Sequence, residues 1–454
     1  MRKKPASACL DFVTGSYDVL TFYGRHAMER NLERSAVGHH AIVIGSRRGT
    51  SSHQYNPMMI LAEQNATEEY GRCYAMSFIY SGGFEASVEM DQIDQTRMIM
   101  GLESEGLRYR LAKGQQWIIP EVIMSYSDVG LGLLSQQLHR CIRDHVCRGV
   151  YQHPDYAMQI PGRQPVRGRN QLILDFSREE VVDAIYEQVK QVLDRNRIEY
   201  LKWDMNRSIC NVYSYSQKIS GEVLYDYMLG VYRFLERLHE EYPELLVEGC
   251  SGGGGRFDAG MLYYTPQIWC SDNTDAINRT RIQYGTSFGY PISTVGSHVS
   301  AVPNHQTGRR TSMRTRATVA MAGSFGYEFD LTKLDKEEKE QIRKDIQTYK
   351  NYAPLIANGD YYRLSDPYRD EVCAWSFVSG QKEECLLSTV QLRIEGNMKP
   401  LYVRLRGLQE HAKYRNTETG EIYSADVLME IGYPLPHIME EYHSEQIHLA
   451  LVQA

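Results

Sequence analysis

Two aspartates at the ends of candidate strands are the first residues of this sequence whose positions could serve catalysis. Asp204 ends the run LKWD (201–204), and Asp272 ends the run WCSD (269–272). If both runs are parallel strands of a barrel, their carboxyl ends lie on the face where such folds place active sites, so the two carboxylates can converge. One ionised carboxylate and one protonated carboxyl group are what the hydrolysis of a glycosidic bond requires.

The neighbours of the two aspartates predict different roles. Lys202 lies two positions before Asp204, on the same side of an extended strand, where its ammonium would favour the ionised carboxylate. Asp272 shares its side of the strand with Ile268 and Cys270, which are apolar neighbours that favour a protonated carboxyl group. We therefore predict Asp204 as the nucleophile and Asp272 as the acid. An aspartate that only caps the following helix stays an alternative for either residue alone.

Other runs with chemical potential are less specific. The run CSGGGGRFD (250–258) follows another candidate strand, and its glycines would let the backbone approach a ligand closely. It matches neither common nucleotide-binding pattern, and a wide structural turn is the alternative. His298 and His305 lack the companion residues of a metal site, so the sequence predicts no metal and no cofactor.

The composition excludes several classes of protein. The chain has 454 residues, of which 42% are hydrophobic and 24% are charged, as in globular proteins. Its net charge of −7 gives no positive field to attract nucleic acid, and no run approaches the roughly 20 apolar residues that span a membrane. Nine scattered cysteines without a CxxC pair suit reduced thiols, so we expect neither a nucleic-acid partner nor a membrane, and a cytoplasmic location.

The pattern of the chain predicts an α/β fold with β-domains on both sides. Residues 84–91 alternate apolar and polar side chains after the turn Ser81-Gly82-Gly83, which is typical of a half-buried antiparallel strand. After about residue 131, strands and helices alternate, as in a parallel sheet, and beyond about residue 358 the helix signals fade. The predicted strands of the middle part are 172–174, 200–204, 245–250, 267–272, 291–296 and 325–331. The predicted domains are 1–130, 131–357 and 358–454.

Several longer motifs carry a resemblance to a known family. The runs KWDMNR (202–207), CSGGGGRFDAGMLYY (250–264), SDNTDA (271–276), GSHVSAVPNHQTGR (296–309) and FGYEFDL (325–331), with SSHQYNP (51–57) and YSGGF (80–84), resemble glycoside hydrolase family 36, the bacterial α-galactosidases. The resemblance implies a (β/α)8-type TIM barrel between an N-terminal β-sandwich and a C-terminal antiparallel β-sandwich.

The resemblance also implies an activity and a site. It implies a retaining enzyme that hydrolyses terminal α-galactosides such as melibiose and raffinose-type oligosaccharides by double displacement, commonly as a homotetramer. Asp204 would be the nucleophile and Asp272 the acid/base. The implied substrate-binding residues are Arg169, Lys202, Asn206, Cys250 and Gly252.

The sequence departs from the family pattern in two places. It begins inside the expected N-terminal sandwich, and near Val150–His153 it lacks the first barrel strands with their DDGWF-type and EPEM-type motifs. About five or six strands are predicted between 172 and 331, whereas a closed barrel needs eight, so we expect an incomplete barrel with exposed strand edges. The alternatives to an active α-galactosidase are therefore an impaired remnant or sugar-binding pseudoenzyme, and an α-glycosidase or transglycosylase of altered sugar specificity.

Overall fold

The computed structural model describes residues 6–142, 158, 160, 173–210, 212–215, 219–397, 399–438 and 440–452. It divides into two compact units, each of which we describe by itself. The first unit comprises Met1–Asp272 and Gly289–Thr294, and the second comprises Asn273–Phe288 and Val295–Ala454. Within the described part of the chain, no helix is both long enough and apolar enough to cross a membrane.

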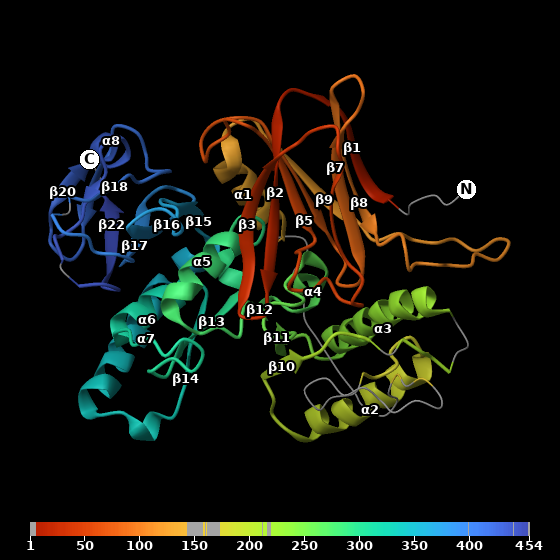
Figure 1. Cartoon of the computed structure of the whole chain (residues 1–454). Helices are drawn as coiled ribbons and strands as arrows, with labels where there is room; N and C mark the ends of the chain where they lie inside the picture. The colour runs from red at the N-terminus through yellow and green to blue at the C-terminus, as the bar shows by residue number, and fades with distance from the viewer. Residues whose placement is uncertain are drawn as a thin grey trace. The chain divides into compact units, whose positions relative to one another are not determined.

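The first unit begins with two antiparallel sheets, which we call the N-terminal sheets (Figure 1). One has the strand order β1-β8-β7-β4 and the other the order β3-β2-β5-β6-β9. Along β7, Phe84, Ala86 and Val88 are buried and alternate with more exposed residues, which confirms the predicted pattern. The strand bounds are β1 Ala6–Thr14, β2 Tyr17–Arg25, β3 Met28–Ala36, β4 Ile42–Ser46, β5 Met58–Glu63, β6 Cys73–Phe78, β7 Phe84–Met90, β8 Gln95–Leu102 and β9 Val122–Ser127.

Helices and parallel strands follow in the same unit. Strand β10 (Tyr200–Asp204) pairs in parallel with β11 (Leu246–Cys250), and β11 pairs in parallel with β12 (Gln267–Trp269). The helices are α1 Gly130–Cys141, α2 Glu179–Arg195, α3 Ser220–Glu241 and α4 Ala259–Tyr264.

Helix α2 forms from an apolar repeat at helical spacing. Its buried residues include Val181, Ile185 and Val189, each four positions after the last, so they share one face. Helices α2 and α3 pack together (Figure 1), and the Tyr186 hydroxyl donates a hydrogen bond of 3.2 Å to the Arg237 carbonyl.

The second unit contains another parallel pair and a larger antiparallel sheet. Strand β13 (Val295–Ser300) pairs in parallel with β14 (Ser324–Glu328), and the large sheet has the order β15-β16-β17-β22-β19-β20. The remaining strands are β15 Asp360–Arg363, β16 Val372–Val378, β17 Glu384–Gln391, β18 Tyr402–Val403, β19 Lys413–Asn416, β20 Ile422–Ser424, β21 Tyr433–Pro434 and β22 Ser444–Leu451. The helices are α5 Ala276–Thr286, α6 Met313–Ala320, α7 Lys336–Asn358 and α8 Ala425–Glu430.

The predicted strands of the middle part compare well with the structure, with corrections at 172–174 and 291–296 and at the end of 267–272, where β12 stops at Trp269. Between 173 and 331, the described residues form five parallel strands, and β10 has the predicted bounds. The strand predicted at 291–296 is wrong, because Thr294 donates its backbone N–H to the Pro291 carbonyl in a short turn and β13 begins only at Val295. Of the strand predicted at 172–174, Leu172 lies outside the described residues, and Leu174 forms only an isolated bridge.

Strand β10 has an unusual exposure for a parallel strand. Its alternate residues Tyr200, Lys202 and Asp204 are all exposed, with Tyr200 at 45%. Parallel strands are ordinarily covered on both faces. One side of β10 is therefore open in this structure.

Candidate active site

Four of the predicted site residues meet at the carboxyl ends of β10 and β11. Asp204 is paired in register with Cys250. Asn206 donates a hydrogen bond of 2.6 Å from Nδ2 to Asp204 Oδ2, and its Oδ1 accepts the Gly252 backbone N–H at 3.0 Å. Asn206 therefore ties the candidate nucleophile to the turn that follows the neighbouring strand.

The thiol beside Asp204 is held in its neutral form. Burial raises the pKa of Cys250 far above its usual range, and the charge of Asp204 and a hydrogen bond with it raise the pKa further. A neutral thiol can donate a hydrogen bond to a carboxylate. Cys250 therefore adds no second negative charge beside Asp204.

Lys202 contacts a buried glutamate that the sequence analysis did not single out. Its Nζ lies 2.8 Å from Oε1 of Glu248, a fully buried residue of β11, and 4.5 Å from the centre of the Trp269 ring. Glu248 also accepts a hydrogen bond of 2.6 Å from the Tyr200 hydroxyl. Sequence reasoning missed Glu248, although Lys202 and Glu248 occupy facing positions of the parallel pair.

Asp272 lies among polar groups, which corrects the predicted apolar environment. Trp269 donates a hydrogen bond of 3.1 Å from Nε1 to Asp272 Oδ1, and His26 Nε2 lies 2.5 Å from Oδ2. The physical reason is that β12 ends at Trp269, so the strand alternation that would place Asp272 beside Cys270 does not extend that far.

The glycine run after β11 is required by close packing of the backbone. Gly253 has a φ of +82°, in the left-handed region that favours glycine. A Cβ at Gly254 would lie 2.3 Å from the Cys270 carbonyl oxygen and 2.6 Å from Arg30 Nη1. The run therefore packs against the segment that leads to Asp272. At Gly254, the glycine is needed for this packing, as the alternative of a structural turn predicted.

A cavity of about 290 Å³ lies beside these groups. Its lining includes Asn206 and Gly252, together with His26 and His53 from the N-terminal sheets. His53 Nε2 lies 2.6 Å from the Gly252 carbonyl oxygen, and burial lowers the pKa of His53 although nearby Glu29 opposes that shift. Sequence reasoning did not single out either histidine; for His53 the available signal was its place within the run SSHQYNP.

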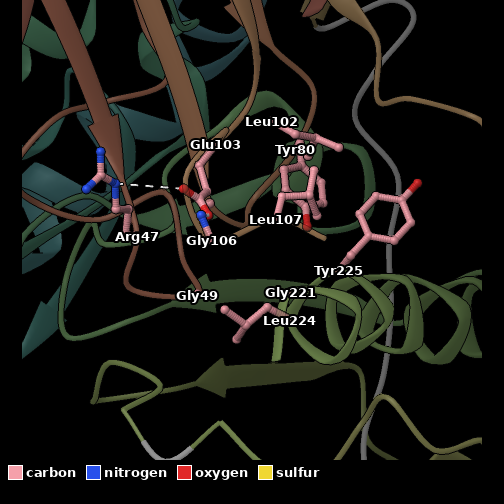
Figure 2. Close-up of a pocket in the computed structure, with 11 residues that line it drawn as sticks. Arg47, Gly49, Tyr80, Leu102, Glu103, Gly106, Leu107, Gly221, Leu224 and Tyr225 are labelled. Atoms are coloured by element: carbon pink, nitrogen blue, oxygen red, sulfur yellow. Dashed lines mark hydrogen bonds and ion pairs between the residues drawn. The ribbon is translucent and has the colours of Figure 1, made fainter. Parts of the chain in front are cut away.

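A second cavity, of about 150 Å³, has a different character (Figure 2). Figure 2 shows Leu102, Leu224 and Tyr225 around it, with Arg47 and Glu103 as an ion pair at 3.7 Å. None of the predicted site residues that the structure describes lines it. We therefore place the candidate site at the cavity lined by Asn206 and Gly252.

Some sequence predictions cannot be placed in the structure. Arg169 and the junction Val150–His153 lie outside the described residues. Among the residues that are described, no group of three or more His, Cys, Asp and Glu side chains could hold a metal ion.

Comparison with known protein families shows which family this chain belongs to. The Melibiase family model matches residues 148–359, and the N-terminal and C-terminal domain models of glycosyl hydrolase family 36 match residues 3–112 and 372–449. The alpha-galactosidase AgaA of Geobacillus stearothermophilus is 36% identical over 98% of this chain and 75% of its own length. The chain belongs to glycoside hydrolase family 36.

Other relatives within family 36 agree. A bifunctional alpha-galactosidase/sucrose kinase of Mediterraneibacter gnavus is 49% identical over 98% of this chain, which spans 58% of that relative's length. The crystal structure of the Geobacillus stearothermophilus enzyme superposes on this chain with a TM-score of 0.95 and 35% identity. The superposition covers 98% of this chain and 76% of that enzyme's chain. Variants of that enzyme have been crystallised with stachyose and with raffinose.

The lengths of these alignments locate a shortfall inside the family 36 match. The match to the Mediterraneibacter gnavus relative runs over 545 aligned positions. Since 98% of this chain is about 445 residues, about 100 of those positions have no counterpart in it. This agrees with the internal shortening expected from the sequence.

Proposed function

We propose that this chain is a retaining α-galactosidase. The observation that carries the proposal is that each aspartate contacts a residue that lines the cavity: Asn206 donates a hydrogen bond to Asp204, and His26 lies 2.5 Å from Asp272. The family supports the substrate class, because the relatives with which the chain aligns are named alpha-galactosidases. Most glycoside hydrolases use two carboxyl groups, one on each side of the bond that breaks.

The contacts of Asp204 support its role as the nucleophile. Asp204 accepts a hydrogen bond from Asn206 and lies beside the neutral Cys250 thiol, an environment that suits an ionised nucleophile. Asp204 would attack the anomeric carbon while Asp272 gives its proton to the departing oxygen. Asp272 would then take a proton from water, and that water would release the sugar with its original anomeric configuration.

The proposed substrates are terminal α-galactosides such as melibiose and raffinose-type oligosaccharides. The complexes of the Geobacillus stearothermophilus variants with raffinose and stachyose support this choice. We assign sugar contacts to Lys202, Asn206, Cys250 and Gly252, of which Asn206 and Gly252 line the cavity. By resemblance, Arg169 is the fifth binding residue.

The architecture and setting proposed for the chain follow the family. An N-terminal β-sandwich (1–130), a (β/α) barrel that lacks early strands (131–357) and a C-terminal β-sandwich (358–454) would form the subunit of a homotetramer. The exposed side of β10 supports an incomplete barrel. The cysteines that the structure describes are all free thiols, which supports a cytoplasmic location.

One observation favours a second candidate function. The open side of β10 carries Lys202 and Asp204, two residues of the proposed site. A site with one uncovered wall would bind the sugar ring less completely than a closed barrel does. An impaired remnant or sugar-binding pseudoenzyme, or an α-glycosidase or transglycosylase of altered specificity, is therefore the alternative.

Release of nitrophenol from a nitrophenyl α-galactoside tests the proposal. The purified chain should release it, Asp204→Ala should abolish release, and Asp94→Asn, at an exposed position of the N-terminal sheets, should leave the rate unchanged. Unchanged turnover by Asp204→Ala would overturn the assignment. A purified chain that binds galactose without turnover would establish the pseudoenzyme instead, and preference for another nitrophenyl α-glycoside would establish altered specificity.

A further inference from the structure

The tip of the hairpin formed by β2 and β3 touches the candidate acid. His26 Nε2 lies 2.5 Å from Asp272 Oδ2, although the two residues are 246 positions apart in the chain. The other carboxyl oxygen, Oδ1, accepts a hydrogen bond from Trp269. We propose that His26 is a positioning residue that holds the Asp272 carboxyl group for proton transfer, an inference that rests on the proposed function.

A second contact fixes the hairpin to the segment that carries Asp272. Arg30, which is 2% exposed, donates a hydrogen bond of 2.7 Å from Nη2 to the Cys270 carbonyl oxygen. Its guanidinium carbon also lies 5.0 Å from the centre of the Phe257 ring. Arg30 lies four residues after His26, and Cys270 lies two residues before Asp272. The contact between His26 and Asp272 is therefore held in place by a buried hydrogen bond close to it in the chain.

The backbone of the hairpin tip is specialised. Ala27 and Arg30 have φ values of +65° and +54°, in the left-handed region that residues with a Cβ rarely adopt. The Ala27 backbone N–H donates a hydrogen bond of 2.9 Å to Oε1 of the buried Glu29, which stabilises this conformation. Strained backbone held by its surroundings is typical of functional sites, and here it aims His26 at Asp272.

The donors around Asp272 distinguish its two carboxyl oxygens. An indole N–H only donates, so Oδ1 accepts from Trp269, while Oδ2 is the oxygen in contact with His26. With its ring proton on Nε2, His26 can donate to the ionised carboxylate, and with that proton on Nδ1 instead, Nε2 can accept from the carboxylic acid. The same contact can therefore hold Asp272 in both protonation states through which an acid/base residue passes.

The dependence on the leaving group tests this role. A sugar leaving group needs a proton from the acid, whereas nitrophenolate leaves with little help. His26→Ala should therefore lower kcat/KM for melibiose by about tenfold and that for a nitrophenyl α-galactoside by less than about threefold. His26→Gln, which keeps a hydrogen-bonding group, should recover part of the loss. His39→Ala, at an exposed histidine of the N-terminal sheets, should change neither value.

The variant Asp272→Asn separates failure of this inference from failure of the proposed function. If Asp272→Asn loses no more activity on melibiose than on the nitrophenyl substrate, Asp272 is not the acid and the proposed function fails. If it shows the selective loss and His26→Ala does not, only the positioning role is overturned.

A stability measurement tests the contact without any activity. The urea midpoints of His26→Ala, Asp272→Asn and the double variant form a double-mutant cycle. We expect the double variant to lose less than the sum of the two single shifts, because the first change already removes the interaction. Additive shifts would overturn the contact on which the inference is built.

Discussion

At the scale of single residues, the site contains a cysteine whose surroundings suppress its reactivity. Cys250 is 4% exposed and lies beside Asp204, and both burial and the neighbouring carboxylate disfavour a thiolate. Cys210 is also in this unit, but its thiol is exposed, with Arg207 Nη2 at 3.0 Å. The two thiols therefore offer a direct test of the electrostatics around Asp204.

We expect iodoacetamide to modify Cys210 and to spare Cys250 in the folded protein. Only the thiolate form of a cysteine reacts with iodoacetamide. Raising the pH from about 7 to about 9 should leave Cys250 unmodified, because the pKa of that thiol is raised well above this interval. Peptide mass spectrometry after timed quenching gives both rates, and unfolding in urea should make them similar. Modification of folded Cys250 at the rate of Cys210 would contradict the described environment.

Strand positions predicted that Asp204 and Cys250 end strands, but they did not predict the long-range partners of the candidate site. Asp204 and Cys250 could be placed together because both end parallel strands. The contact between His26 and Asp272 could not be predicted, since it depends on how a hairpin near the start of the chain meets a segment 246 positions later. The environment of Asp272 was predicted wrongly because the sequence does not show that β12 ends at Trp269.

At the scale of elements, the turn after β11 joins the proposed nucleophile to the proposed acid. Gly252 lies next to Asn206, and Gly254 packs on the Cys270 carbonyl, so one turn contacts both sides of the site. A methyl group at Gly254 would meet backbone and the buried Arg30, neither of which can move freely.

The matched substitutions Gly254→Ala and Gly380→Ala test this packing. We expect Gly254→Ala to lower the free energy of unfolding by about 1–3 kcal/mol, because the added Cβ overpacks a filled space. At Gly380, no atom lies within 4 Å of the added Cβ, so Gly380→Ala should change the free energy of unfolding by less than about 0.5 kcal/mol. Urea unfolding followed by tryptophan fluorescence measures both. Equal midpoints for the two variants would mean that the turn is not packed as described.

Elements with a clear period were predicted well, and those set by turns were not. The bounds of β10 match the predicted strand 200–204. The start of β13 does not, because Pro291 opens a turn within a run that reads as a strand. The boundaries of the three predicted domains stay a prediction, since compact units in the structure are divided differently.

At the scale of the whole molecule, we attribute the exposed side of β10 to the residues that this chain lacks relative to its relatives. About 100 positions of the Mediterraneibacter gnavus relative have no counterpart within the alignment. Tyr200 is 45% exposed and Leu246 is 42% exposed, although both belong to the parallel strands that carry the site. Strands of this kind are normally covered, so the missing positions are those that we expect to cover them.

A chimera tests that expectation. Inserting the relative's unmatched segment at the predicted junction near Val150–His153 should cover the exposed side of β10, where each apolar side chain that becomes fully buried contributes about 1.5–3 kcal/mol. We expect a higher urea midpoint, weaker fluorescence of a bound hydrophobic dye, and faster turnover of a nitrophenyl α-galactoside, because the sugar would gain its missing wall. A chain with a Gly/Ser-rich insert of equal length is the control. If the chimera and this control behave alike, the open side of β10 is not the place of the missing strands, and the shortfall has another structural meaning.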